Sequence, residues 1–162
     1  MKSDFTLRRA TRADAGAIHR LIVELSRATG LPHKVSSTAA DFRAHGFGDD
    51  AAFEALLAES AGDVVGMALW FYTFSTWRGE RGVYLQDLVV SERARGRGLG
   101  RQLLAAVAQI TLEAGATHIR LSVDIDNAGA MRFYRSCGFA ECTDERIYMI
   151  DGRRLAALEA DA

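Results

Sequence analysis

The feature that most constrains this chain is an apolar run that leads into a glycine-rich turn. Residues 83–90 (VYLQDLVV) are strongly β-prone, and Gln86 and Asp87 are their only strongly polar members. Such a run is typical of a central strand that is covered on both faces of its sheet. The turn that follows, residues 95–101 (RGRGLGR), leads into a segment whose apolar residues recur at helical spacing. We therefore expect a strand, a glycine turn and a helix, in that order.

The remaining segments alternate between strand-like and helix-like patterns. A capping-box pattern at 11–14 predicts the start of the first helix, which should end before Gly30. A polar connection is expected at 75–82. Further strands are expected at 5–9, 52–59, 64–74, 118–124 and 147–150, and further helices near 38–41, from 99 to about 115, and from Asp126 or Asn127 to Gly138. No repeat, low-complexity tract or linker divides the 162 residues, so we expect one α/β (α+β) domain over 1–162.

Composition excludes several classes of protein. The formal charge of -1 argues against a nucleic-acid binder, because such proteins carry a basic excess. Neither a signal segment nor an apolar run of about 20 residues is present, so we expect a cytoplasmic protein that does not enter a membrane. Cys137 and Cys142 lack a further cysteine or a close histidine, which favours free thiols and no metal site.

The glycine turn predicts an anion site. Glycines allow the backbone to approach a phosphate closely, and the start of a helix points unpaired N–H groups at the same place. The spacing of Gly96, Gly98 and Gly100 differs from that of a dinucleotide-binding turn, and the Lys-Ser/Thr pair of a P-loop is absent. An ordinary exposed connection has a similar composition, so the turn alone leaves both interpretations open. Positive charge around the turn would come from Arg93, Arg95, Arg97 and Arg101.

A second motif narrows these alternatives. Arg95-x-x-Gly98-x-Gly100 after an apolar strand resembles the pyrophosphate-binding motif of the GCN5-related N-acetyltransferases (GNAT), and Asn127-x-x-Ala130-x-x-Phe133-Tyr134 resembles that family's other signature. The nearer resemblance is to the polyamine (spermidine/spermine) and thialysine acetyltransferase branch. It rests on Phe74-Ser75-Thr76-Trp77, Tyr84-Leu85-Gln86-Asp87 and Leu31-Pro32-His33, and covers nearly the whole chain.

The resemblance implies a fold and a co-substrate. The sheet should be mixed, mostly antiparallel and flanked by helices, with central strands 83–90 and 118–124 that splay apart. Acetyl-CoA should lie in that splay, and no metal is implied. A homodimer is also implied, with residues 151–160 as an interface helix or, alternatively, as a helix folded on its own domain. The implied cofactor-binding residues are Leu88, Val89, Val90, Arg95, Gly96, Arg97, Gly98, Leu99, Gly100, Arg101, Asn127 and Ala130.

The resemblance also assigns catalytic roles. Tyr134 stands where the family has its general acid, which would protonate the departing thiolate in a direct attack by an amine. The branch usually has Glu where this chain has Gln86, and a neutral amide cannot accept a proton as a carboxylate does. Asp87 is retained and could act as base, through water, or by attracting an ammonium group. A carboxylate that only binds backbone N–H groups is an equal alternative.

The acceptor is the least constrained part of this prediction. We expect a small-molecule amine that is bound by His33, Trp77, Gln86 and Asp87. The branch's polyamine-binding Tyr-Glu pair is replaced by Ala28-Thr29, so spermidine and spermine should be poor substrates. Two alternatives remain open: acetylation of a protein lysine or N-terminus, and a domain that binds acyl-CoA without catalysis.

Overall fold

The structure is a computed structural model that describes residues 4–160. The chain forms two compact units, Met1–Asn127 and Ala128–Ala162. The single domain expected over residues 1–162 therefore stays a prediction.

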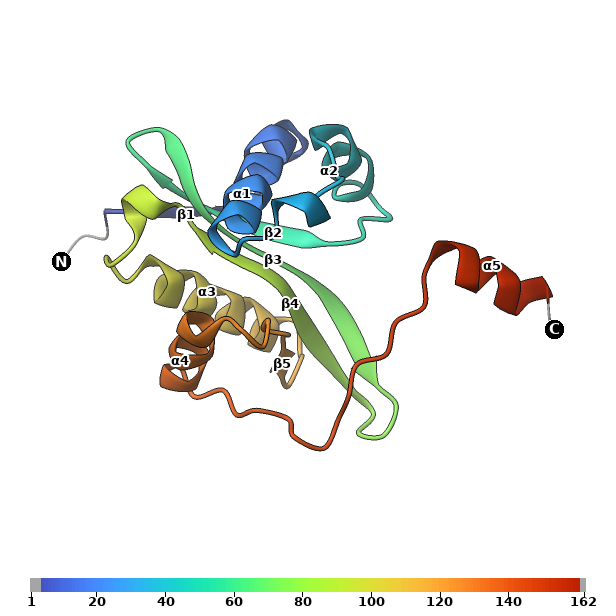
Figure 1. Ribbon diagram of the computed structural model, residues 1–162. Coiled ribbons are helices and arrows are strands. Elements are labelled where there is room, and N and C mark those ends of the chain that lie inside the picture. The colour runs from blue at the N-terminus through green and yellow to red at the C-terminus, as the bar shows by residue number, and fades with distance from the viewer. Residues whose placement is uncertain (1–3, 161–162) are drawn as a thin grey trace. The chain divides into compact units, whose positions relative to one another are not determined.

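The first unit is built on a mixed sheet (Figure 1). Within residues 4–127 the sheet has five strands, which lie side by side in chain order. Every neighbouring pair is antiparallel except β4 and β5, which are parallel. This confirms the expected mixed, mostly antiparallel sheet. The strands are β1 (Thr6–Arg9), β2 (Glu54–Ser60), β3 (Asp63–Ser75), β4 (Glu80–Val90) and β5 (Ile119–Arg120).

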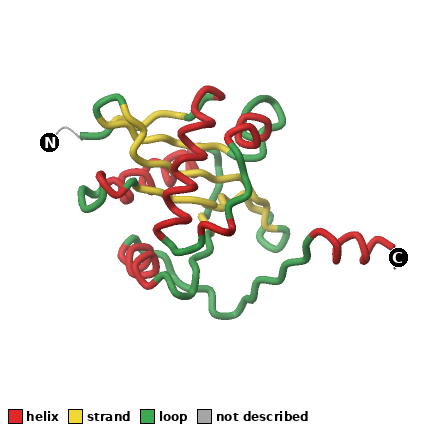
Figure 2. The backbone as a smooth tube through the Cα atoms, turned by 45° about the horizontal axis from the view of Figure 1, so that its top comes forward, coloured by secondary structure: helices red, strands yellow, loops and turns green. Residues whose placement is uncertain are grey.

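Helices cover both faces of this sheet, as Figures 1 and 2 show. One face, called the α1 face below, carries α1 (Ala15–Ala28) and α2 (Ala39–His45), and the opposite α3 face carries α3 (Leu99–Glu113). Short 3-10 turns connect these elements: η1 (Arg12–Asp14), η2 (Pro32–Lys34) and η3 (Glu92–Ala94). The apolar core of the α1 face contains Ile18, Leu21, Ala55, Leu57, Met67, Leu69 and Val89.

Close packing fixes the start of α3 against the sheet. A Cβ atom on Gly66 of β3 would lie 3.0 Å from Leu99 Cδ2 and 3.2 Å from the Val89 carbonyl oxygen, so a larger residue here would have to displace the start of α3 by a few tenths of an ångström. Leu99 and Leu103 are almost fully buried, at 1% and 0% exposed. The sheet therefore holds the helix start, and with it the glycine turn, in a defined position.

An ion-pair network fixes the start of the chain's first helical segment. Arg8 donates to both Asp14 oxygens at 2.8 Å and to Glu59 of β2 at 2.8 Å. These hydrogen bonds from Arg8 hold the pKa of Asp14 well below its usual range. Asp14 also accepts from the Thr11 backbone N–H at 2.7 Å. The predicted capping box is confirmed, but it opens η1 and α1 begins only at Ala15.

Strand lengths differ from the expectation in two places. β3 runs to Ser75 and β4 begins at Glu80, so half of the expected polar connection at 75–82 is strand and only 76–79 connect the two strands. β5 spans only Ile119–Arg120, against the 118–124 that alternation predicted. The antiparallel hairpin is thus longer than predicted because cross-strand pairing continues through polar residues, whereas the parallel pair is shorter.

The second unit contains α4 (Ala128–Ser136) and α5 (Gly152–Ala160). The expected strand at 147–150 is wrong, since no residue from 128 to 160 is in a strand and the connection between the helices is loop (Figure 2). The run is β-prone, but a strand also needs a partner that supplies its hydrogen bonds. Throughout residues 4–160 no helix is both long enough and apolar enough to cross a bilayer.

Candidate functional site

The glycine turn has the backbone shape that its sequence predicts. Gly96 and Gly98 have φ angles of 74° and 77°, in the left-handed region that favours glycine, and α3 begins at Leu99. The first intrahelical bond is donated by Gln102 to the Gly98 carbonyl at 3.1 Å. The N–H groups of the preceding residues therefore point out of the helix start, toward any bound anion.

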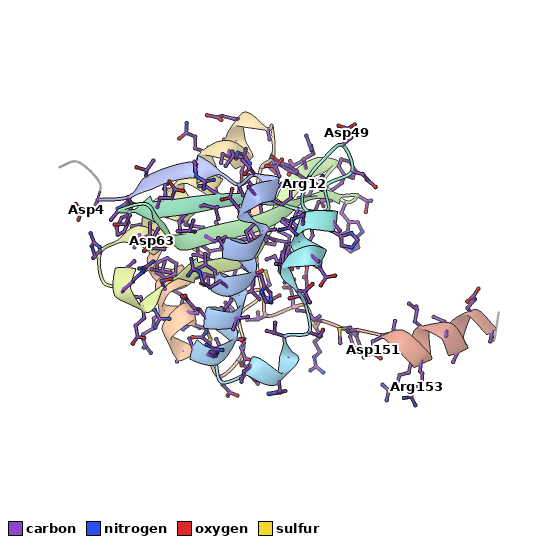
Figure 3. The ribbon with its side chains drawn as sticks, turned by 90° about the horizontal axis from the view of Figure 1, so that it is seen from above. Asp4, Arg12, Asp49, Asp63, Asp151 and Arg153 are labelled. Carbon is purple, nitrogen blue, oxygen red and sulfur yellow. The ribbon has the colours of Figure 1, made fainter. Side chains whose placement is uncertain are left out.

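Two of the arginines around the turn are held by acidic partners that the motif does not reveal. Arg93 donates to Asp63 at 2.9 Å, and Arg97 donates to Asp4 at 2.7 Å. Figure 3 shows both carboxylates at the same end of the sheet. Arg95 donates instead to the Val90 carbonyl at 3.2 Å, at the end of β4. The local positive charge is therefore partly neutralised in the free protein.

The turn fits a pyrophosphate group. Gly96 and Gly98 are exposed, and a Cβ atom on either would meet no described heavy atom within 4 Å, so the backbone is open to a ligand. Leu99 differs, because its side chain belongs to the core and only its backbone could face the ligand. As to metals, residues 4–160 contain no group of three or more His, Cys, Asp or Glu side chains that could hold an ion.

The outer half of β4 presents an unpaired edge toward β5. The parallel ladder consists of Val83 opposite Ile119 and Tyr84 opposite Arg120. β4 continues to Val90, and no described strand pairs with residues 85–90 on this side. The expected splay of the two central strands is present. The free backbone groups of residues 85–90 could pair with an extended ligand arm.

A β-bulge at Gln86 determines which way the polar residues of β4 face. The register steps from Leu85 opposite Trp70 to Asp87 opposite Leu69, so Gln86 is the extra residue. Cross-strand partners share a face, and Leu69 belongs to the core under α1. Asp87 therefore lies on the α1 face. Burial raises the pKa of Asp87 to about 6, whereas Gln86 is exposed.

Two further residues on the α1 face escaped the sequence analysis as site residues. The hydroxyl groups of Tyr84 and Ser122 are hydrogen-bonded at 2.7 Å, just beyond the last β4–β5 backbone pair. Phe71 of β3 stacks on the Tyr84 ring with centroids 5.2 Å apart. Alternation along β4, continued from β5 to Ser122, is the signal that could have placed these side chains on one face once the register was known.

The second signature spans the boundary between the two units. Asn127 ends the first unit, and its N–H donates to the Asp124 carbonyl at 2.9 Å. Ala130 and Tyr134 lie one helical turn apart on α4, on one side of that helix. The Tyr134 ring packs against Phe133 and Phe139, at centroid distances of 5.2 and 5.5 Å. This aromatic cluster holds Tyr134 within its own unit.

The remaining predicted substrate residues lie on exposed segments. His33 is an exposed residue of η2. Trp77 lies in the turn between β3 and β4 and is 98% exposed. From Glu80, where β4 starts, to Asp87 the strand extends about 20 Å. The structure thus places Trp77 further from Asp87 than a small amine would span, while Gln86 and Asp87 are adjacent.

A glycine turn that ends an unpaired strand edge suits a carrier molecule with phosphates at one end and an extended arm. Residues 17–139 match the model of the "Acetyltransferase (GNAT) family", and the chain belongs to that family. It is an acetyl-CoA-dependent N-acetyltransferase, and its relatives place it in the polyamine and thialysine branch.

Two curated relatives illustrate this placement. Thialysine N-epsilon-acetyltransferase from Mus musculus is 36% identical over 146 residues, which cover 85% of each chain. Spermidine/spermine N(1)-acetyltransferase-like protein 1 from Homo sapiens is 31% identical over 148 residues, which cover 87% of this chain but 21% of that longer protein.

Solved structures show the same fold. An integron cassette protein from the mobile metagenome of V. cholerae superposes with a TM-score of 0.82 at 23% identity, covering 96% of this chain and 98% of that one. An aminoglycoside acetyltransferase from an uncultured soil metagenomic sample, in complex with sisomicin, gives a TM-score of 0.75 at 17% identity, covering 91% and 97%. At these identities the likeness concerns the fold alone.

Proposed function

We propose that this enzyme transfers the acetyl group of acetyl-CoA to the primary amine of a small molecule, by direct attack of the amine on the thioester. The observation that carries this proposal is Asp87, a carboxyl group with a pKa raised to about 6, on the strand edge that leads to the glycine turn. Near neutral pH such a group is ionised yet basic enough to accept a proton.

The proposed reaction needs one base and one acid. Asp87 takes a proton from the incoming ammonium group, directly or through water, and the amine nitrogen then bonds to the acetyl carbon. The carbon–sulfur bond breaks, and Tyr134 donates its phenolic proton to the departing thiolate. Gln86 cannot act as base, but its exposed amide can orient the amine through hydrogen bonds.

The co-substrate would be held by backbone groups more than by side chains. The unpaired groups of Leu88, Val89 and Val90 would pair with the pantetheine arm, as an added strand does. The N–H groups of 95–101 would bind the pyrophosphate, and Arg95 and Arg101 would add charge. Asn127 and Ala130, from the second signature, are proposed to complete this binding site.

The acceptor is proposed to be a short amine of the thialysine type. Ala28 and Thr29, at the end of α1, are exposed and carry no negative charge, and Gln86 is neutral. A polyamine with several ammonium groups would miss acidic partners at these positions. His33 would contact the acceptor from η2, whereas Trp77 lies too far along the hairpin to contact a short amine held at Asp87.

A substrate panel tests the proposed function. Thiol release from acetyl-CoA would be measured with thialysine, lysine, ornithine, spermidine, an aminoglycoside and a lysine-containing peptide. We expect the short amino acids to react fastest and spermidine slowly. Preference for the peptide would favour a protein acetyltransferase, and absence of turnover with tight acetyl-CoA binding would favour a non-catalytic domain.

The role of Tyr134 has its own test. Tyr134→Phe should lower kcat about ten-fold to a thousand-fold and leave acetyl-CoA affinity unchanged, because only the acid proton is lost. Tyr72→Phe is the matched control, because it removes the same hydroxyl group from a tyrosine without a proposed catalytic role. Tyr72 pairs with Val83, and Arg81 lies over its ring. Unchanged kcat in Tyr134→Phe would remove Tyr134 from this role.

We also propose that the enzyme is a cytoplasmic homodimer. Cys137 and Cys142 are free thiols, as is usual in a reducing compartment. Ile147, Tyr148 and Met149 are 82–86% exposed, and such apolar runs commonly mark a protein interface. α5, with Leu155 and Leu158 exposed, would extend that interface.

Sedimentation equilibrium tests the dimer. The variant Tyr148→Ser/Met149→Ser should shift the protein toward monomer, whereas Leu112→Ser, on the exposed side of α3, should not. A monomeric wild-type protein at micromolar concentration would contradict the proposal.

A further inference from the structure

We propose that the hydrogen bond between the Tyr84 and Ser122 hydroxyl groups closes the inner end of the unpaired β4 edge and so limits the length of the acyl group that the enzyme accepts. The proposal rests on the proposed placement of the pantetheine arm along residues 88–90. It adds a specificity-determining pair to that site.

The bridge lies where the two central strands part. Tyr84 opposite Arg120 is the last backbone pair, and the Tyr84 and Ser122 oxygens lie 2.7 Å apart just beyond it. The bulge at Gln86 follows at once on β4, and a bulge bends and twists its strand. The bridge therefore ties β4 to the chain after β5 at the point where the bulge begins to turn β4 away.

Packing holds the bridge in place. The Tyr84 ring stacks on Phe71 with an interplanar angle of 21°, so the ring has little freedom to swing away from Ser122. On the α3 face the same level of β4 is filled by Leu85, which is 2% exposed. An extended arm that runs inward from Val90 thus meets converging backbones, the hydroxyl bridge on one face and Leu85 on the other.

The register sets the room that is left. Asp87 and Tyr84 lie opposite Leu69 and Phe71, two residues apart on β3, so their side chains are separated by about 7 Å along the strand. The bridge lies between these two levels, because Ser122 follows the Tyr84–Arg120 pair by two residues in the direction of Asp87. The room between Asp87 and the bridge is therefore shorter than this spacing. Each acyl carbon adds about 1.3 Å, so a butyryl group meets the bridge where an acetyl group does not.

The test compares acyl-CoA chain lengths. Wild-type kcat/KM, measured by thiol release with a fixed amine, should fall at least about a hundred-fold from acetyl-CoA to butyryl-CoA. In the double variant Tyr84→Phe/Ser122→Ala, which removes both hydroxyl groups, the ratio of butyryl to acetyl kcat/KM should rise at least about ten-fold. Propionyl-CoA should show an intermediate effect in both proteins.

Controls separate this proposal from the proposed function. Tyr72→Phe removes a tyrosine hydroxyl at the neighbouring register position on β3, on the α3 face, and should leave the chain-length ratio at the wild-type value. Calorimetric affinities for acetyl-CoA and butyryl-CoA supply a readout that does not need turnover. If no amine is acetylated, the proposed function fails, whereas these affinities still test the bridge.

Three results would overturn the inference. The first is that the wild-type protein uses butyryl-CoA and acetyl-CoA equally well, or binds them equally where turnover is absent. The second is a double variant whose ratio of butyryl to acetyl kcat/KM stays within two-fold of wild type. The third is a Tyr72→Phe variant that raises this ratio as much as the double variant does.

Discussion

The two ends of the unpaired β4 edge, residues 85–90, are built in different ways. At the outer end, Val90 passes into a turn in which residues 91–101 alone supply the glycines, the arginines and the helix start. At the inner end, the groups come from three separate segments: Phe71 from β3, Tyr84 and Asp87 from β4, and Ser122 from the chain after β5. The outer end is a local structure, and the inner end depends on register.

On the proposed function, this difference separates the binding of the co-substrate from the selection of the acyl group and the amine. A phosphate cradle made of backbone N–H groups needs little beyond its own turn, so it can stay constant while substrates change. The inner end depends on the bulge at Gln86, which places Tyr84 and Asp87 on one face although they are three residues apart. Small changes there would alter the chemistry without disturbing the cradle.

The largest expected effect is at Asp87. Asp87→Asn keeps the size of the side chain but removes the proposed base, so kcat should fall about a hundred-fold to ten-thousand-fold at pH 7.5 with little change in acetyl-CoA affinity. Wild-type kcat should rise with pH through about 6, as the carboxyl group with its raised pKa ionises. Retention of activity by Asp87→Asn would instead make Asp87 a structural carboxylate.

The same variant has a second readout in stability. Because burial raises the pKa of Asp87 above its unfolded value, the folded state binds this proton more tightly, and stability should fall as pH rises from about 4 through 6. The ionised carboxylate would cost up to about 3 kcal/mol at pH 7. Denaturant unfolding should find Asp87→Asn more stable than wild type at pH 7 and equal to it at pH 4.

The next effect tests the packing that joins the central strands at the inner end. A Cβ atom on Gly82 would lie 2.2 Å from Nε2 of His118, whose carbonyl accepts from the Val83 N–H at 2.9 Å. Gly82→Ala should therefore cost about 1–3 kcal/mol of unfolding free energy, measured by urea denaturation. The same substitution in a His118→Ala background should cost much less. Equal costs in both backgrounds would show that the contact with the imidazole is not the source of the cost.

At the outer end, Gly98→Ala probes the cradle. With φ at 77°, alanine is strained by about 1–2 kcal/mol, and its methyl group would project into the proposed pyrophosphate site. KM for acetyl-CoA should rise about ten-fold with kcat nearly unchanged. Gly115→Ala is the matched control, because Gly115 has a φ of 70°, open space around its Cβ, and lies just past the other end of α3. A similar rise in KM in the control would implicate α3 stability instead of the cradle.

The features that could be predicted from the sequence lie at the outer end of the β4 edge, and those that could not lie at the inner end. The strand, the turn and the helix start were predicted because glycine at positive φ and helical periodicity are local signals. The bulge was not, because it appears only when β4 is aligned with β3, and the Tyr84–Ser122 contact joins residues 38 apart in the chain.

The wrong strand at 147–150 has the same origin. Its side chains are β-prone, and local propensity cannot tell whether a partner strand is present. The acidic partners of the turn were missed for a related reason: Asp4 and Asp63 reach Arg97 and Arg93 only after the sheet has brought distant segments together.

The smallest expected effect is on acetyl-CoA affinity and concerns the ion pair between Asp4 and Arg97. It tests whether the outer end depends only on its own turn. Arg97 is shared between Asp4, at 2.7 Å, and the Phe5 ring, 4.6 Å from its guanidinium carbon. A bound pyrophosphate would have to compete with Asp4 for this arginine. Asp4→Asn should therefore tighten acetyl-CoA binding two- to three-fold at low salt, since exposed ion pairs contribute up to about 1 kcal/mol. The gain should disappear above about 0.5 M salt, where surface charges are screened.

Asp49→Asn makes the same charge change at the opposite end of the sheet (Figure 3) and should leave the affinity unchanged. Equal gains in both variants would mean that net charge, and not the Asp4–Arg97 pair, sets the affinity, and the outer end would then be as local as its motif implies.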